Sequence, residues 1–143
     1  MRHAGDFYKD KDIQVIWGYL QIGKIIDDPE EQKRLWWHPH ASTERRKNKT
    51  NVIFQAAERL SFDDNKPGAG LLPYAVKRVL TLKDHNKVTW KYHTIYDTNH
   101  IQSCRKNAAK EPEKGIYYAG IWQELVLKES EDCMLWAKSI VLE

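Results

Sequence analysis

The sequence predicts a single α+β domain, residues 1–143, with a small mixed sheet or partial barrel, mostly antiparallel, and two or three peripheral helices. Short segments rich in β-branched and aromatic residues recur along the chain, as strands do. They do not alternate regularly with helical segments, which argues against a doubly wound parallel sheet. The length, the 41% hydrophobic content and the 30% charged content are those of one globular domain.

The longest strand-like segment covers residues 13–26. Apolar side chains occupy both of its alternating faces, so we expect it at the centre of the sheet, buried on both sides. Gly18 and Gly23 interrupt the segment, so we expect either two strand segments or one long strand bent at Gly18. Further strands are expected at residues 51–60, 79–82 and 87–92.

Two helices are expected. Asp27-Asp28-Pro29-Glu30-Glu31 opens the first, because Asp caps a helix and Pro suits its first position, and this helix runs to about Trp36. Residues 131–142 carry apolar side chains at helical spacing and predict a C-terminal helix packed outside the sheet. A helix from Phe54 is the alternative to the strand at 51–60. Loops are expected at residues 38–50, 63–70 and 97–115, and a helix start near Gln123.

The formal net charge of +3 falls short of the strongly basic surface of a DNA-coating protein. The distribution of charge says more, because Arg45, Arg46, Lys47 and Lys49 lie within five residues. Such a cluster either meets phosphates or forms a solvated loop.

The compartment is expected to be the cytoplasm. Cys104 and Cys133 match no metal-ligand spacing or redox motif, so free thiols in a reducing compartment are expected. No apolar run approaches the roughly 20 residues that cross a bilayer, and the N-terminus has no signal-peptide core. A membrane is therefore not among the expected partners.

The most conspicuous polar motif is His38-Pro39-His40. Two imidazoles two residues apart can face one side of an extended segment and serve in hydrogen bonding or proton transfer. The alternative is a structural role, in which His38 caps the preceding helix or fills a hydrogen bond in the turn made by Pro39. A metal would need a third ligand from elsewhere, such as His93, His100 or Glu124, and no metal is expected. No Walker loop, GxGxxG, HExxH or paired CxxC occurs, so the sequence identifies no cofactor.

Aromatic residues accompany these polar groups. On a strand, Trp17, Tyr19 and Gln21 share one face, where rings could stack on a base while the amide reads its edge. Trp36 and Trp37 directly precede His38. The alternative is that Trp17 and Tyr19 belong to the core.

Several of these segments together resemble the third family of nucleotide modification associated domains. The resemblance rests on Gly-Tyr-Leu-Gln-Ile-Gly at 18–23, His-Pro-His-Ala at 38–41, Asn-Val-Ile-Phe at 51–54, Pro-Gly-Ala-Gly at 67–70, Val-Leu-Thr at 79–81, Trp90, and Trp-Gln-Glu-Leu-Val at 122–126. It extends over residues 2–126 and implies a link to bacterial and bacteriophage systems that modify DNA bases or nucleotides.

The resemblance carries two further implications. Family members usually have an additional N-terminal region that ends in a Gly-Asp-Leu-Phe-Leu-Phe-Phe-like strand, and this sequence is expected to lack it. The order of that strand and the segment at 16–23 is similar to barrels of the PUA-like superfamily, which include readers of modified bases. A chain without the first strand would complete such a barrel by pairing in a homodimer.

Our first hypothesis is therefore that the chain is a module that binds nucleic acid or nucleotides and recognises a modified base. We expect His38, His40, Asn51, Gln123 and Glu124 to converge on one cleft that the aromatic residues shape. The second hypothesis is an enzyme of base or nucleotide modification, with His38 or His40 as the acid–base group and Glu124 as its partner. The third is an oligomerising phage protein.

Overall fold

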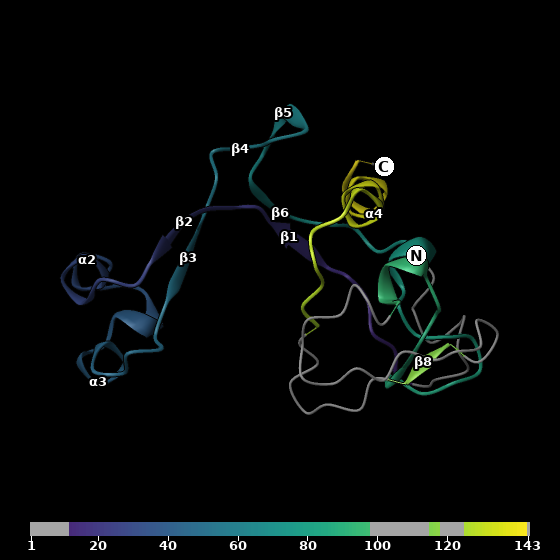
Figure 1. Ribbon diagram of the computed structural model, residues 1–143, viewed down its shortest axis with the longest axis horizontal. Helices are drawn as coiled ribbons and strands as arrows, with labels where there is room; N and C mark the ends of the chain where they lie inside the picture. Colours follow the sequence, from purple (N-terminus) through teal and green to yellow (C-terminus); the bar gives the residue numbers. More distant parts are fainter. Residues whose placement is uncertain (1–11, 98–114, 118–124, 143) are drawn as a thin grey trace. The chain divides into compact units, whose positions relative to one another are not determined.

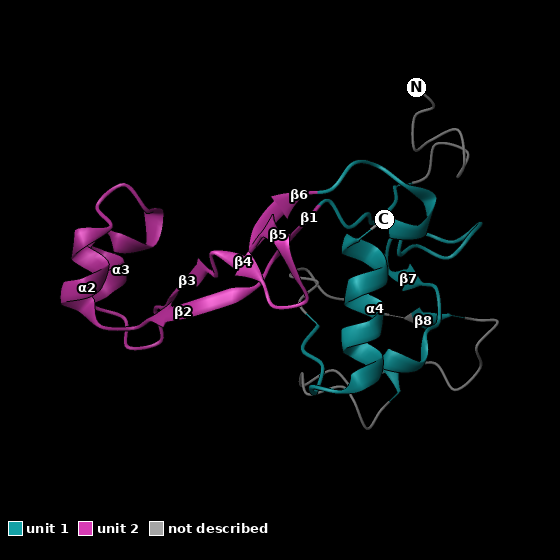
Figure 2. Cartoon of the chain, turned by 90° about the horizontal axis from the view of Figure 1, so that it is seen from above, with its two compact units in different colours: residues 1–17, 72–143 teal, residues 18–71 magenta. Residues whose placement is uncertain are grey.

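The computed structural model describes residues 12–97, 115–117 and 125–142, which form short antiparallel sheets and helices (Figure 1). The chain divides into two compact units (Figure 2). Unit 2 consists of residues 18–71, and unit 1 consists of residues 1–17 and 72–143. The α+β class is confirmed, and the described strands form no closed barrel.

Unit 2 is built on antiparallel strand pairs (Figure 1). The pairs are β1 (Gly18–Leu20) with β6 (Ala69–Leu71), β2 (Ile22–Ile26) with β3 (Ile53–Ala56), and β4 (Arg59–Leu60) with β5 (Asp63–Pro67). The strand expected at 51–60 is thereby confirmed, and the alternative helix from Phe54 is wrong. The loop expected at 63–70 is also wrong, because backbone pairing with β4 and β1 outweighs the turn-like composition of this segment.

Residues 18–26 form two strand segments, β1 and β2, which confirms one of the two alternatives for the segment at 13–26. The other alternative, one long bent strand, is wrong, and so is the expected position at the centre of the sheet. The segment changes partner at Gln21, so that β1 pairs with β6 whereas β2 pairs with β3. Leu20, Ile22 and Ile25 are each about half exposed, at 48%, 50% and 55%. The apolar residues on both faces therefore reflect a two-stranded ribbon with open faces and not a sheet centre.

Gln21 is the junction of these strand pairs. Its backbone N–H donates to the Gly68 carbonyl at 2.7 Å, and its carbonyl accepts from the Ala57 N–H at 2.8 Å. Its side-chain Oε1 accepts from the Ser61 N–H, also at 2.8 Å. Gly68 is required here, because a Cβ on it would lie 2.0 Å from the Ala57 carbonyl oxygen. The glycine pattern that the family resemblance rests on thus has a packing explanation.

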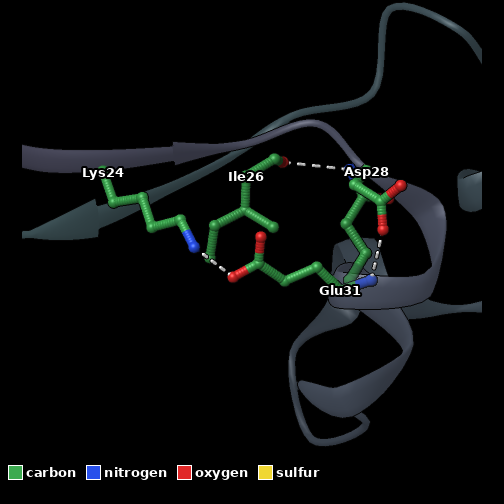
Figure 3. A network of polar contacts seen from close by, with 5 residues as sticks. Lys24, Ile26, Asp28 and Glu31 are labelled. Atoms are coloured by element: carbon green, nitrogen blue, oxygen red, sulfur yellow. Dashed lines mark hydrogen bonds and ion pairs between the residues drawn. The ribbon is translucent and has the colours of Figure 1, made fainter.

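Helices close the far end of the β2–β3 ribbon. The expected first helix is confirmed as α2 (Pro29–Arg34), and the Asp28 carboxylate caps it by accepting from the Glu31 N–H at 2.7 Å (Figure 3). The Glu31 carboxylate also pairs with the Lys24 ammonium of β2 (Figure 3). This pair is largely exposed and contributes at most about 1 kcal/mol.

The segment expected to be a loop at 38–50 contains two helical turns, so the prediction is wrong for most of it. The turns are the 3₁₀ helix η1 (Pro39–Ala41) and the α-helix α3 (Thr43–Arg46). Ser42 caps α3 with a hydroxyl that accepts from the Arg45 N–H at 3.4 Å. The basic cluster therefore begins on a short helix. The buried core of this region is formed by Ile26, Ala41 and Ile53, with Leu35 packed against it.

Unit 1 contains the C-terminal helix that the sequence predicts, α4 (Glu131–Val141). Its other elements are η2 (Val76–Arg78), β7 (Thr89–Trp90), η3 (Thr94–Tyr96) and β8 (Ile116–Tyr117). The strands expected on either side of the turn at 83–86 appear as a bridge between Thr81 and Trp90 and as β7 itself, which pairs with β8.

The core of unit 1 is aromatic and aliphatic, with Trp90, Ile95, Tyr96 and Ile116 buried together. Burial, and to a smaller extent the nearby Cys133 thiol, raises the pKa of the Tyr96 phenol well above its usual value. The phenol therefore stays neutral at any physiological pH.

The end of α4 is held by side chains from η2. Arg78 is 2% exposed; its Nε donates to the Ile140 carbonyl at 3.1 Å and its Nη1 to the Pro73 carbonyl at 2.7 Å. Lys77 Nζ donates to the Ser139 carbonyl at 3.0 Å. Two cations thus satisfy carbonyls at the negative end of the helix dipole. None of the helices in the described part of the chain has the length and apolar character that crossing a bilayer requires.

Candidate functional site

A pair of buried amides organises the end of unit 2 that carries the histidines. Gln32 of α2 is 1% exposed, and its Nε2 donates to the carbonyls of Ile26 at 3.1 Å and Asn51 at 3.0 Å. Because two carbonyls accept from this nitrogen, the other amide atom must be the oxygen. That oxygen accepts from Asn51 Nδ2 at 2.8 Å.

The amide of Asn51 in turn fixes His40. Asn51 Nδ2 also donates to the His40 carbonyl at 3.0 Å, so Asn51 Oδ1 is the atom that faces the ring, 3.1 Å from His40 Nδ1. An amide oxygen can only accept, and Nδ1 must therefore carry a proton. The neutral ring of His40 then has its lone pair on Nε2.

His38 has the opposite arrangement. Its Nδ1 accepts from the His40 backbone N–H at 3.2 Å, which caps η1. The hydrogen bond in the Pro39 turn, which the sequence offered as the structural alternative for this residue, is therefore present. Because Nδ1 is used as an acceptor, the neutral ring of His38 has its proton on Nε2. The structure thus makes Nε2 of His38 a donor and Nε2 of His40 an acceptor.

The two imidazoles lie side by side in one pocket of about 510 Å³. Their ring centroids are 5.7 Å apart and the rings meet edge to face. The pocket is lined by Leu20, His38, His40, Arg45, Asn48, Thr50, Asn51, Val52, Ile53 and Phe54. The lining therefore combines polar and basic side chains with apolar ones.

The polar wall offers more donors than acceptors. Asn48 Oδ1 accepts from the backbone N–H and the hydroxyl of Thr50, each at 2.9 Å, which leaves the Asn48 NH₂ group available. The Arg45 guanidinium forms no hydrogen bond or ion pair within the described residues, and it is exposed. No Asp or Glu is among the residues that line the pocket. An anionic group is the ligand that such a wall favours.

The four residues of the basic cluster are not equivalent. Arg45 lines the pocket, whereas Arg46 turns its Nε to the Ala41 carbonyl at 3.0 Å and its Nη2 to Thr43 Oγ1 at 3.4 Å. Arg46 therefore joins α3 to η1. Lys47 and Lys49 are exposed and do not line the pocket.

The aromatic residues expected around the site differ in their exposure and in their contacts. Trp36 and Trp37 are 84% and 65% exposed, and the Trp37 ring lies edge-on to His38 with centroids 5.7 Å apart. Tyr19 donates its hydroxyl to the Pro67 carbonyl at 3.1 Å. Trp17 is 72% exposed and belongs to unit 1, so the structure does not place it against the pocket.

Of the cleft that the sequence predicts, the structure brings together His38, His40 and Asn51, with Arg45 beside them. Gln21 lies at the strand junction, where its side-chain oxygen is used by Ser61. Gln123 and Glu124 lie outside the described residues. So does the helix start expected near Gln123, and most of the irregular segment expected at 97–115.

Sequence reasoning missed Gln32, Asn48, Thr50 and Phe54 as site residues. A signal existed for Asn48, because Asn two residues before Thr favours a side-chain turn of the kind seen here. Gln32 gave none, since a Gln on a short helix is ordinarily exposed. Among the described residues, three or more His, Cys, Asp or Glu side chains do not gather in any position that would hold a metal ion.

Fold and pocket together define a small α+β protein with a basic, histidine-lined pocket. The family model for nucleotide modification associated domain 3 matches residues 2–128. The chain belongs to this family, as the resemblance of its motifs indicated, and the family name associates it with nucleotide modification. The similarity to PUA-like barrels stays a prediction. Searches of the curated proteins and of the solved structures gave no significant match.

Proposed function

We propose that this chain is a nucleic-acid or nucleotide-binding module that holds a nucleotide in the pocket formed by His38, His40 and Arg45. The observation that carries the proposal is the mixed lining of that pocket, which combines imidazole, guanidinium and amide groups with apolar side chains. A nucleotide offers a partner to both kinds of group, because it has an anionic phosphate and a base with apolar faces.

The dimensions of the pocket support this proposal. A volume of about 510 Å³ lies within the range of about 300–1,000 Å³ that is usual for small-molecule sites. Phe54 is half exposed and forms part of the apolar wall, where a base could stack on it. The family's association with nucleotide modification supports a base that carries a modification as the preferred ligand.

A fluorescence titration tests the proposal. Trp37 lies edge-on to His38, so a ligand that contacts His38 should change tryptophan emission. We expect saturable changes with nucleotides or short oligonucleotides, tested in modified and unmodified forms, and a weaker response in a Trp37→Phe variant. If no nucleotide or oligonucleotide binds at millimolar concentration, the proposal is wrong.

An enzyme that modifies bases or nucleotides is the second candidate, and the geometry of His40 favours it. Asn51 holds the Nδ1–H of His40, and this leaves Nε2 to accept and return a proton without loss of that hydrogen bond. His38 is less suited to this role, because protonation of its Nδ1 would remove the cap on η1. Only His40 is therefore proposed as the acid–base group.

Mass spectrometry of incubated nucleotides and DNA distinguishes the two candidates. An enzyme should change the mass of a nucleotide or a base, and His40→Asn should abolish the change. Asn at position 40 still offers an N–H to Asn51 but has no atom in the place of Nε2. Binding without any change of mass, under conditions that supply candidate donor groups, favours the binding module.

A further inference from the structure

Resting on the proposed nucleotide-binding function, we infer that the pocket recognises a phosphate monoester, as found in a nucleoside monophosphate or at the end of a strand, in preference to an internal phosphodiester. The inference comes from the hydrogen-bonding state of the two imidazoles and from the groups beside them. It names the chemical class of the ligand, which the binding function alone leaves open.

Three groups in the pocket can donate to phosphate oxygens at neutral pH. They are the Arg45 guanidinium, the Asn48 NH₂ group and the Nε2–H of His38. A phosphate monoester has three terminal oxygens and a charge of about −1.5 to −2 at pH 7, so it can engage all three donors. An internal phosphodiester has two terminal oxygens and a single charge.

His40 adds the discriminating contact. Its Nε2 is an acceptor in the neutral ring, because Nδ1 holds the proton that Asn51 binds. A phosphate monoester binds a second proton with a pKa of about 6, so a fraction of it still carries that proton at pH 7 and can share it with Nε2. The proton can reside on either partner, and the hydrogen bond remains. A phosphodiester has no such proton, so its oxygen would face a lone pair unless the ring first took a proton from water.

The titratable and charged groups around His40 do not oppose this arrangement. Within the pocket these are His38 and Arg45. Arg46 of α3 is directed to the Ala41 carbonyl, and Glu31 of α2 pairs with Lys24. Lys49 is exposed outside the pocket lining. No carboxylate among the lining residues would repel the ligand.

The apolar residues of the pocket lining can contact the sugar and the base of the ligand. Leu20, Val52 and Phe54 line the pocket together with the polar groups. A sugar and base attached to the bound phosphate would cover these side chains, which removes apolar surface from water at roughly 25 cal/mol per Å². Inorganic phosphate should therefore bind more weakly than a nucleoside monophosphate and compete with it.

The experiment compares three forms of each common deoxynucleoside at pH 7, using the complete chain and calorimetry. These are the 5′-monophosphate, its methyl ester, which is a phosphodiester, and the nucleoside without phosphate. We expect at least one monophosphate to bind at least about tenfold tighter than its methyl ester and its nucleoside. A short oligonucleotide with and without a 5′-phosphate then shows whether a free nucleotide or a strand end is preferred.

Variants locate the effect. His40→Asn keeps the hydrogen bond to Asn51 but lacks Nε2. It should bring the ratio of monoester affinity to diester affinity close to one. His38→Asn keeps a side-chain acceptor for the His40 N–H and should weaken monophosphate binding. Lys33→Gln removes a positive charge from α2 outside the pocket and should change neither value.

Each outcome bears on the inference. A methyl ester or a longer unphosphorylated strand that binds as tightly as the monophosphate would overturn the monoester preference while the binding function stands. If His40→Asn leaves the ratio of monoester affinity to diester affinity unchanged, the monoester preference is also overturned, because His40 is then not the discriminating group. If none of the compounds binds, the proposed function itself is wrong, and the inference fails with it.

Discussion

Asn51 holds His40 through both atoms of its amide. Its Nδ2 donates to the His40 carbonyl at 3.0 Å, and its Oδ1 lies 3.1 Å from His40 Nδ1. The same Nδ2 donates to Gln32 Oε1, so that the orientation of a surface imidazole is set by a buried pair of amides. Asn51 is 8% exposed and Gln32 is 1% exposed, which shields this network from water. His40 is therefore held in place before any ligand arrives.

Replacing Asn51 by Ala should destabilise unit 2 strongly. The change leaves Gln32 Oε1 and the His40 carbonyl without their donor, and an unsatisfied buried polar group costs about 1–3 kcal/mol. We expect a loss of about 2–4 kcal/mol in the free energy of unfolding, measured in urea. Asn48→Ala is the control and should cost at most about 1 kcal/mol, because within the described residues the Asn48 side chain bonds only the exposed Thr50. Equal losses would show that the buried network contributes nothing special.

Gly68→Ala should disrupt the strand junction. The added methyl group would lie 2.0 Å from the Ala57 carbonyl oxygen, so the backbone of one strand has to move. A cost of about 3 kcal/mol is expected, at the upper end of what overpacking causes. Ser61→Ala leaves the backbone bond to Gln21 intact and should stay within about 0.5 kcal/mol of the parent. A Gly68→Ala protein that is as stable as the parent would contradict the strand arrangement.

Replacing Arg45, Lys47 and Lys49 by Gln should weaken binding of a 5′-phosphorylated oligonucleotide. Arg46 is kept, because its Nε holds the Ala41 carbonyl. The slope of log affinity against log salt should flatten by about 0.7–0.9 for each phosphate that the variant no longer neutralises, with little change in the melting temperature. The double variant Lys33→Gln with Arg34→Gln is the control on α2. A salt slope that the triple variant leaves unchanged would mean that the cluster is only a solvated surface.

The stability of unit 1 should fall at alkaline pH in part through Tyr96. Its pKa is raised by burial, so the folded state keeps the phenolic proton to higher pH than the unfolded state. The stabilisation is present below the unfolded tyrosine pKa of about 10 and decreases above it. Tyr96→Phe should flatten the decline in unfolding free energy above pH 10. Parallel curves for the two proteins would refute the contribution of Tyr96.

Tyr92 and Lys91 also have shifted pKa values, and both residues remain in the Tyr96→Phe variant. The pKa of Tyr92 is raised, chiefly by its hydrogen bond to Asp97, so Tyr92 changes the stability at alkaline pH in the same direction as Tyr96. The pKa of Lys91 is lowered by burial, so its effect on stability has the opposite sign. Only the difference between parent and variant therefore measures Tyr96.

Local signals in the sequence predicted α2 and α4 but missed the short helices η1 and α3. Asp28 and Pro29 gave the start of α2, and apolar spacing gave α4, because capping and helical periodicity act within a few residues. The strands were harder. Residues 63–70 have the composition of a turn, yet they form β5 and β6, since pairing with β4 and β1 involves partners that composition does not reveal.

Part of the candidate site could be predicted from the sequence. His38, His40 and Asn51 stand out as polar groups at the borders of apolar segments, and the structure brings them into one pocket. The roles of Gln32 and Arg46 depend on which carbonyls face them after folding, and a pattern of residue types cannot show this. The tautomers of the two histidines likewise follow only from contacts made on folding, those of His40 with Asn51 and of His38 with the His40 N–H.

The central claim, that a nucleotide binds where two histidines are held in opposite tautomers, can be tested most directly by long-range ¹H–¹⁵N NMR of the imidazoles. Without ligand, the neutral rings should show a proton on Nδ1 of His40 and on Nε2 of His38. On titration with deoxynucleoside 5′-monophosphates, the Nε2 signals of these two residues should shift, while those of His85 and His93 in unit 1 stay in place. Identical tautomers in the free protein, or ligand-induced shifts at His85 or His93 and none at His38 and His40, would contradict the account.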